Sequence, residues 1–292
     1  MRIITRLQGG LGNQLFQYAA ARALALRLGT RIEFDLSALN SDKKRRFELC
    51  AFRFPSTVRT VSYMDGHRRI TVIEWLDRID VVREKHFEFD AEMEKISPRR
   101  SIHLIGYWQT ERYFKSAEPQ IRSDLEFIQP PDGPNRDMLA RIQAVNAVSV
   151  HFRRGDYVNE KHTAAFNGVP SLQYYHRAVT EILATCADAK LFVFSDDPQW
   201  VRQNFHPPAP VTIVDINTPD QPTADLRLMA ACRHHILANS SFSWWGAWLN
   251  PDPAKRVFAP NRWFLPDYNT IDLLPSGWRT LEADLAMAWS KS

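Results

Sequence analysis

Residues 147–157 read AVSVHFRRGDY, and this stretch indicates both a fold and a binding site. It begins with the alternating apolar residues Val148, Val150 and Phe152, the pattern of a buried β-strand. Four polar residues then follow within six positions: His151, Arg153, Arg154 and Asp156. Two guanidiniums at the open end of an α/β sheet form a fixed fork suited to a diphosphate. A simple surface pair between arginine and aspartate is the alternative left open at this point.

The rest of the second half alternates strands and helices. We expect strands at 147–152, 190–194, 211–214, 235–238 and 256–259, with helices near 173–185, 198–205, 224–233 and through Trp248. This order predicts a doubly wound parallel sheet whose ligand groups gather at the carboxyl ends of its strands. Two further clusters fall there, Ser195–Asp197 and Asn239–Trp245. The second combines hydroxyls with a helix N-terminus, which favours either an anion site or an ordinary helix cap.

The N-terminal stretch predicts a βαβ unit. Strands are expected at 2–7 and 31–34, and a helix between them follows the glycine-rich turn 8–14, with Asn13 as its N-cap. The turn resembles a dinucleotide-binding fingerprint. The bulky Leu15 stands where a third small residue should allow close helix packing, which argues against a nicotinamide or flavin enzyme.

The middle of the chain is less informative. Residues 37–100 predict helices and surface loops, and the basic run 43–46 is interpreted as a solvated face. A strand at 102–107 leads into Trp108 and Gln109, whose mixed aromatic and polar character suits a sugar-facing wall or a core.

Composition limits the classes of function. The chain has 292 residues, 45% of them hydrophobic, and a turn-rich segment at 129–134, which together predict two domains, 1–130 and 131–292. The net charge of +4 fits an anionic ligand and does not require nucleic acid. Three widely spaced cysteines without metal-ligand spacing predict free thiols in a reducing compartment. With no signal peptide or membrane anchor in the pattern, we expect a cytoplasmic protein.

Five motifs together resemble a known family. They are GGLGNQLFQYAAARALA at 9–25, GYWQTERYF at 106–114, HFRRGDYV at 151–158, FSDDP at 194–198 and ANSSFSWWGAWLN at 238–250. In this order they are similar to the bacterial α-1,2-fucosyltransferases of glycosyltransferase family 11.

The resemblance implies an α/β fold of the GT-B type, in which two Rossmann-like domains face each other across a cleft. It implies inverting transfer of L-fucose from GDP-β-L-fucose to O2 of a terminal β-galactoside, with the acceptor on the 1–130 side and GDP-fucose on the 131–292 side. It implies no cofactor and no metal, and the sequence contains no Asp-x-Asp pair.

The resemblance also implies roles for individual residues. Arg153 would bind the β-phosphate and neutralise the departing GDP. Of Arg154 and His151, which lie on either side of it, one would orient the loop or the phosphate and the other would lie near the nucleoside. Either Asp196 or Asp225 would accept from guanine. The other donor-binding candidates are Asn13, Asn239, Ser240, Ser241 and Phe242, and the acceptor-side candidates are Gly10, Gln14, Trp108 and Gln109. Asp156 is either the catalytic base or a residue that fixes the two arginines.

Two competing functions remain open at this stage: fucose transfer with an α-1,3 or α-1,6 linkage, and a GDP- or sugar-binding module without catalysis. The resemblance further implies a role in bacterial surface polysaccharide or O-antigen synthesis on a lipid-linked galactose-terminated glycan. Peripheral contact with the inner membrane is then expected.

Overall fold

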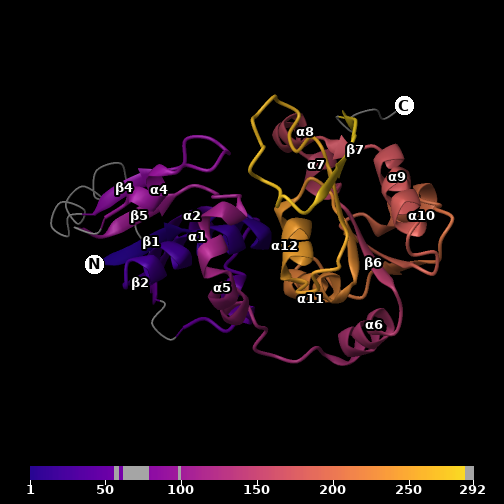
Figure 1. The fold of residues 1–292 in the computed structure, drawn as a ribbon, viewed down its shortest axis with the longest axis horizontal. Helices are drawn as coiled ribbons and strands as arrows, with labels where there is room; N and C mark the ends of the chain where they lie inside the picture. The colour runs from indigo at the N-terminus through magenta and orange to yellow at the C-terminus, as the bar shows by residue number, and fades with distance from the viewer. Residues whose placement is uncertain (56–58, 62–78, 98–99, 287–292) are drawn as a thin grey trace. The chain divides into compact units, whose positions relative to one another are not determined.

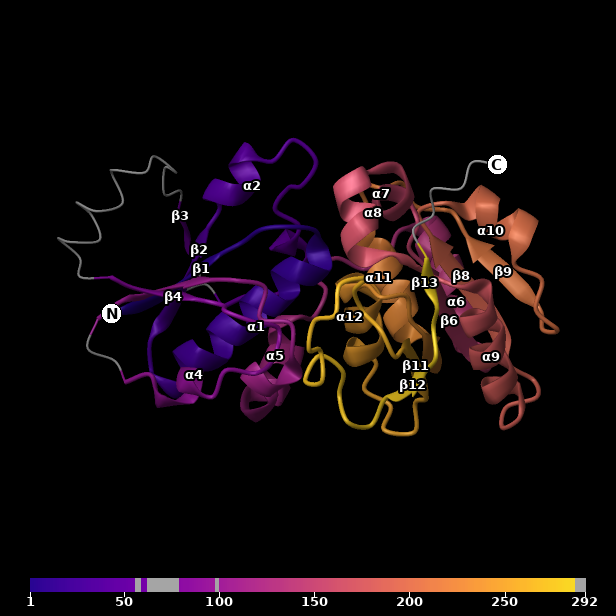
Figure 2. The ribbon, with the colours of Figure 1, turned by 90° about the horizontal axis from the view of Figure 1, so that it is seen from above.

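The computed structural model describes the chain except for residues 56–58, 62–78, 98–99 and 287–292. Two compact units are present: residues 1–130 together with 269–275, and residues 131–268 together with 276–292. Each is an α/β unit with a parallel sheet (Figures 1 and 2). Part of the segment for which we expect helices and loops, 62–78, lies outside the described residues.

The first unit has a five-stranded sheet in the order β3-β2-β1-β5-β4, and all described neighbours are parallel. Its strands are β1 (Arg2–Arg6), β2 (Arg31–Asp35), β3 (Arg59–Val61), β4 (Asp80–Arg83) and β5 (Ile102–Ile105). Its helices are α1 (Leu11–Arg27), α2 (Ser37–Ser41), α4 (Glu92–Lys95) and α5 (Glu118–Asp124), with short 3-10 turns at Leu49–Ala51, Glu111–Tyr113 and Lys115–Ala117. Since β1 pairs directly with β5, the loops after these two strands start side by side at one edge of the sheet.

The second unit has six parallel strands in the order β12-β11-β10-β6-β8-β9. They are β6 (Ala147–Phe152), β8 (Lys190–Ser195), β9 (Val211–Val214), β10 (His234–Ile236), β11 (Val257–Pro260) and β12 (Arg279–Leu281). Numbered from β6 in chain order, this is the 3-2-1-4-5-6 order of a dinucleotide-binding sheet, whose ligands bind where the order reverses. That point lies between β6 and β10.

Helices cover both faces of this sheet. They are α6 (Gly133–Gln143), α7 (Gly155–Asn159), α8 (Lys161–Asn167), α9 (Leu172–Leu183), α10 (Pro198–Asn204), α11 (Pro222–Ala231) and α12 (Ser241–Leu249). A small antiparallel pair, β7 (Val169–Pro170) and β13 (Leu285–Ala286), lies apart from the main sheet.

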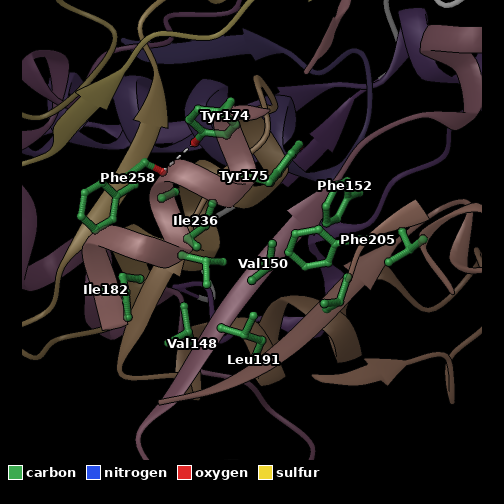
Figure 3. Close-up of a cluster of buried hydrophobic side chains, with 14 of the residues drawn as sticks. Val148, Val150, Phe152, Tyr174, Tyr175, Ile182, Leu191, Phe205, Ile236 and Phe258 are labelled. Carbon is green, nitrogen blue, oxygen red and sulfur yellow. Dashed lines mark hydrogen bonds between the residues drawn. The ribbon is translucent and has the colours of Figure 1, made fainter. Parts of the chain in front are cut away.

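Side chains alternate between the two faces of β6, so this strand contributes to a hydrophobic cluster on each face of the sheet. Val148, Val150 and Phe152 point to one face and join a cluster with Tyr174 and Ile182 of α9 (Figure 3). Ala147 and the out-of-phase phenylalanines of β8 join the other cluster, against α6 and α11. Every residue of β6 is buried, as expected for a central parallel strand.

The expected parallel α/β architecture is confirmed, and the five strands predicted in the second half lie within two residues of their observed positions. Strands β7, β12 and β13 were not predicted, and the expectation of only helices and loops for 37–100 is wrong at β3 and β4, which extend the first sheet. In the part of the chain that the structure describes, no helix is long and apolar enough to cross a membrane. Cys50, Cys186 and Cys232 are all free thiols.

The prediction that Asn13 caps α1 is wrong. The helix begins at Leu11, with Gly10 in the capping position and no capping side chain of its own. Burial raises the pKa of Glu48, and the nearby charges of Arg45 and Arg46 and the backbone N–H of Leu11 oppose that rise. Because the helix begins at Leu11, Asn13 lies within its first turn, and the Oδ1 of Asn13 accepts from Gln109.

Residues Asn269–Pro275 leave the second unit and belong to the first. Asp272 anchors this return: its carboxylate accepts from the backbone N–H of Phe89 at 3.0 Å and pairs with Arg112 at 2.6 Å. No pattern in the sequence predicts this return.

Candidate functional site

Arg153 lies just past the end of β6 and is held by two carboxylates. Its Nη2 is 2.9 Å from Oδ1 of Asp156 on α7, and its Nη1 is 2.9 Å from Oδ2 of Asp196, which follows β8. Its guanidinium also lies 5.6 Å from the centre of the Tyr157 ring. A guanidinium has five N–H donors, so these two pairs leave three donors for other acceptors.

Arg154 has a different environment. Its Nε is 3.2 Å from Oδ2 of Asp197, and its guanidinium stacks 3.7 Å from the centre of the Trp200 ring. Its backbone N–H donates to Oδ1 of Asp196 at 2.8 Å, so Asp196 fixes the turn and pairs with Arg153 at the same time. These contacts support the orienting role among those that the resemblance implies for Arg154.

Gly155 is needed for this packing. A Cβ atom at this position would lie 2.7 Å from Oδ2 of Asp196, the oxygen that pairs with Arg153. Glycine therefore lets the chain turn close over the carboxylate.

Neighbouring charges shift the pKa values of Arg153 and His151, at the end of β6, in opposite directions. Burial alone would lower the pKa of Arg153, but the carboxylates of Asp196 and Asp156 outweigh it and raise that pKa above its usual value. Burial, with the nearby charge of Arg153, lowers the pKa of His151 to about 3. His151 is therefore a neutral imidazole at pH 7, and its buried Nδ1 finds no hydrogen-bond partner among the described residues.

The turn between β10 and α12 lies on the other side of the reversal point. Ser240 caps α12 by accepting from the backbone N–H of Phe242 at 3.3 Å, and the Phe242 ring lies 5.6 Å from the ring of His151. Ser241 is the first residue of the helix. The structure thus brings this turn beside the end of β6, as parallel strand order requires.

Asn239 is almost fully buried and acts as a brace. Its amide nitrogen donates to the backbone carbonyls of Asn167 and Trp263, both at 2.9 Å, and more weakly to that of Gly168. The backbone carbonyl of Asn239 accepts from the hydroxyl of Tyr157. These contacts support a role in positioning the turn.

Asp225 belongs to a separate cluster near the end of β9. Asn217 donates to its Oδ1 at 2.7 Å and exchanges two hydrogen bonds with Asn135. Burial raises the pKa of Asp225 to about 6, and the bond from Asn217 works against that rise. Of the two aspartates considered for guanine, Asp196 is engaged with the arginines, whereas Asp225 is not.

In the first unit, the glycine-rich turn is bound to the basic loop that follows α2. Gln14 is fully buried, and its amide nitrogen donates to the backbone carbonyls of Gly9 and Arg46 at 2.9 and 2.8 Å. Its Oε1 accepts from the backbone N–H of Glu48. Gly10 lies beside Arg45, whose Nη1 would be 3.5 Å from a Cβ atom there.

The loop after β5 meets the same turn. Gln109 donates to Oδ1 of Asn13 at 2.8 Å, so two candidates that are 96 residues apart are in direct contact. Trp108 is buried with a φ of 58°, in the left-handed region that non-glycine residues seldom adopt. The sequence analysis missed Glu84, whose carboxylate accepts from the backbone N–H groups of Tyr107 and Trp108.

Comparison with solved structures identifies the fold class. The crystal structure of NodZ α-1,6-fucosyltransferase soaked with GDP-fucose matches with a TM-score of 0.54 and 16% identity, over 89% of this chain and 94% of NodZ. The chain therefore has the α/β fold of the GT-B class of glycosyltransferases. Among the described residues, no group of three or more His, Cys, Asp or Glu side chains is placed to hold a metal ion.

The family follows from the sequence relatives. Residues 2–265 match the profile of glycosyl transferase family 11, and the chain belongs to that family. It is 30% identical to the O-antigen biosynthesis glycosyltransferase WbnK of Escherichia coli, over 94% of this chain and 99% of WbnK. It is 31% identical to an Escherichia coli alpha-1,2-colitosyltransferase, over 96% and 99% of the two chains. The galactoside alpha-(1,2)-fucosyltransferase 2 of Sus scrofa is 24% identical, over 95% and 79%.

Proposed function

We propose that this glycosyltransferase moves L-fucose from GDP-β-L-fucose to O2 of a terminal β-galactoside, with inversion at the anomeric carbon. The observation that carries the proposal is the position of Arg153. Its guanidinium is held by Asp156 and Asp196 at the end of β6, where the strand order of a dinucleotide-binding sheet reverses. That position suits a diphosphate, and the family membership makes the diphosphate part of a sugar donor.

Arg153 stabilises the departing GDP. Charge develops on the β-phosphate as the glycosidic bond breaks, and a preorganised guanidinium lowers the energy of that charge without having to reorganise. The three N–H donors that its ion pairs leave are available for phosphate oxygens. In this proposal the arginine takes the part that a divalent cation plays in other nucleotide-sugar enzymes, and no metal is required.

The surroundings of Arg153 suit the remainder of the donor. Ser240, Ser241 and the N–H groups at the start of α12 are donors for phosphate or sugar oxygens. Neutral His151 lies beside Phe242 and offers a hydrogen bond without adding charge. Asp225, the acid that the arginines do not use, is our candidate for the guanine base.

Inversion requires O2 of the acceptor to attack from the face opposite GDP, through a transition state with oxocarbenium character. Asp156 pairs with Arg153, which supports its role in fixing the arginine and weakens the case for it as catalytic base. We assign the acceptor side to Gly10, Gln14, Trp108 and Gln109, and a donor contact to Asn13. The hydrogen bond from Gln109 to Asn13 would then connect an acceptor-binding residue with a donor-binding one.

Transfer of colitose is the second candidate, because one bacterial relative at 31% identity is an alpha-1,2-colitosyltransferase. Colitose is L-fucose without its 3-hydroxyl, so the same diphosphate site would serve either donor. The α-(1,2) linkage in the names of both the bacterial and the mammalian relatives supports attack by O2 over the α-1,3 and α-1,6 alternatives.

The test is transfer of labelled fucose from GDP-L-fucose to lactose in excess EDTA, with the product linkage read by NMR. An α-1,2 product in EDTA is expected. GDP-colitose in a parallel reaction decides between the donors, and the faster substrate at equal concentration identifies the natural class. If neither donor reacts, a calorimetric titration with GDP separates an unsuitable acceptor from a wrong donor site.

We further propose that the biological acceptor is a lipid-linked O-antigen glycan at the inner face of a bacterial cytoplasmic membrane. The O-antigen name of one relative and the net charge of +4 support this setting. Co-sedimentation with vesicles containing anionic lipid tests it: binding lost in high salt is expected, and no binding at low salt would contradict the membrane contact.

A further inference from the structure

We infer that Glu84 is a positioning residue for the acceptor: its carboxylate holds the loop Gly106–Gln109 in the conformation that places Gln109 against Asn13. The inference rests on the proposed function for the nature of the acceptor. The two hydrogen bonds by which the Glu84 carboxylate holds this loop, here called the clamp, are observed independently of that proposal.

One carboxylate binds two adjacent backbone donors. Oε2 of Glu84 accepts from the N–H of Tyr107 at 2.7 Å, and Oε1 accepts from the N–H of Trp108 at 2.8 Å. Glu84 is itself fixed, because its backbone N–H donates to the carbonyl of Ile105 at 2.9 Å where β4 and β5 end together. Short bonds to a charged acceptor are about twice as strong as neutral ones.

The loop needs such a clamp because its backbone is strained. Trp108 has a φ of 58°, and a bulky residue in the left-handed region costs about 1 kcal/mol or more. Its indole Nε1 is also buried without a hydrogen-bond partner among the described residues. Strain of this kind persists only where surrounding contacts determine the conformation, and it is concentrated at functional sites.

Gly106 makes room for the clamp. A Cβ atom at this position would lie 2.4 Å from Cβ of Glu84 and 3.0 Å from its Oε2. Any larger residue would push the carboxylate away from the two N–H groups. Gly106 and Glu84, 22 positions apart, therefore act together to hold the loop.

The loop that Glu84 holds lies at the edge of the sheet where ligands are expected to bind. The loop follows β5 at the carboxyl end of the parallel sheet, directly beside the glycine-rich turn after β1, which is where such sheets bind ligands. Gln109 is nine-tenths buried, and its amide donates to Oδ1 of Asn13 at 2.8 Å. A side-chain amide has both donors and an acceptor, which can pair with the hydroxyl groups of a sugar.

The experiment replaces Glu84 by glutamine, which keeps the shape but turns one of the two acceptor atoms into a donor. We expect the KM for lactose to rise about tenfold, while the affinity for GDP, whose proposed diphosphate contact Arg153 belongs to the other unit, stays within about twofold. Glu92→Gln is the matched control, because Glu92 is an exposed acid of the same unit whose carboxylate pairs with Lys95 at the surface. If Glu84→Gln does not fold, Glu84→Asp, which keeps the charge but is too short to reach both N–H groups, is measured in its place.

Amide hydrogen exchange measures the clamp without any substrate. The amides of Tyr107 and Trp108 should be protected in the native chain and exchange at least about tenfold faster in Glu84→Gln. Unprotected amides in the native protein would overturn the inference, and so would a folded variant with an unchanged KM for lactose. Absence of fucose transfer by the native enzyme would instead contradict the proposed function, because the exchange result stands on its own.

Discussion

Replacing Arg153 by alanine should slow transfer about a hundredfold while the chain stays folded. Two unit charges 4 Å apart attract by about 4 kcal/mol at an effective dielectric constant of about 20. A quarter of the Arg153 side chain is exposed, so solvent screening reduces this to about 3 kcal/mol. Each 1.36 kcal/mol is about tenfold in rate, which gives the hundredfold estimate.

Release of GDP at saturating GDP-fucose and lactose measures this loss, and thermal unfolding checks the fold. Arg153→Lys should recover less than about a tenth of native turnover, because an ammonium cannot contact both carboxylates and the phosphate as a fork does. Arg177→Ala is the control, since Arg177 forms an exposed pair with Glu282. Near-native turnover in a folded Arg153→Ala enzyme would refute the reasoning.

Three further substitutions test other parts of the structure. Gly155→Ala should lower kcat about tenfold by displacing the Asp196 carboxylate, whereas Gly133→Ala, with open space around it, should have no effect on the same assay. Tyr174→Phe removes a hydroxyl whose single O–H is shared between two buried carbonyls, at 2.8 and 3.1 Å, and should cost about 2 kcal/mol in urea unfolding; a loss below about 0.5 kcal/mol would contradict it. Asp35→Asn should destabilise the chain by about 2 kcal/mol at pH 7. Burial raises the pKa of Asp35, but the bonds from His103 and Ser37 outweigh it and lower that pKa to about 2. The difference in unfolding free energy between the native chain and the variant should therefore disappear as the pH falls from about 4 to about 2. A pH-independent difference would exclude that origin.

The second half of the fold was predictable because its signals are local. Fully buried parallel strands such as 147–152 are short apolar runs, and those runs alternate with amphipathic helices such as 172–183. The start of α1 was not predictable in this way. The helix begins two residues before Asn13, at Leu11, and Gly10 in the capping position has no side chain from which this start could be recognised.

In the candidate site, too, the residues next to a predicted strand could be placed from the sequence, whereas their tertiary partners could not. His151 and Arg153 could be placed at a ligand edge because they end a predicted strand. The partners that define the chemistry of Arg153 include Asp196, 43 positions away, and its engagement with the arginines is a tertiary contact. Glu84 lies in a charged run that looks like solvated surface, so only the fold reveals the two N–H groups it binds.

The return of Asn269–Pro275 to the first unit has a consequence for engineering. Because the first unit is assembled from two stretches of chain, an exchange of the two units between relatives cannot be made with a single junction at 130. A chimera with that junction would place a foreign residue opposite Arg112 and the backbone of Phe89, in the position of Asp272. Three junctions, near residues 130, 268 and 276, would keep each half with its own anchor.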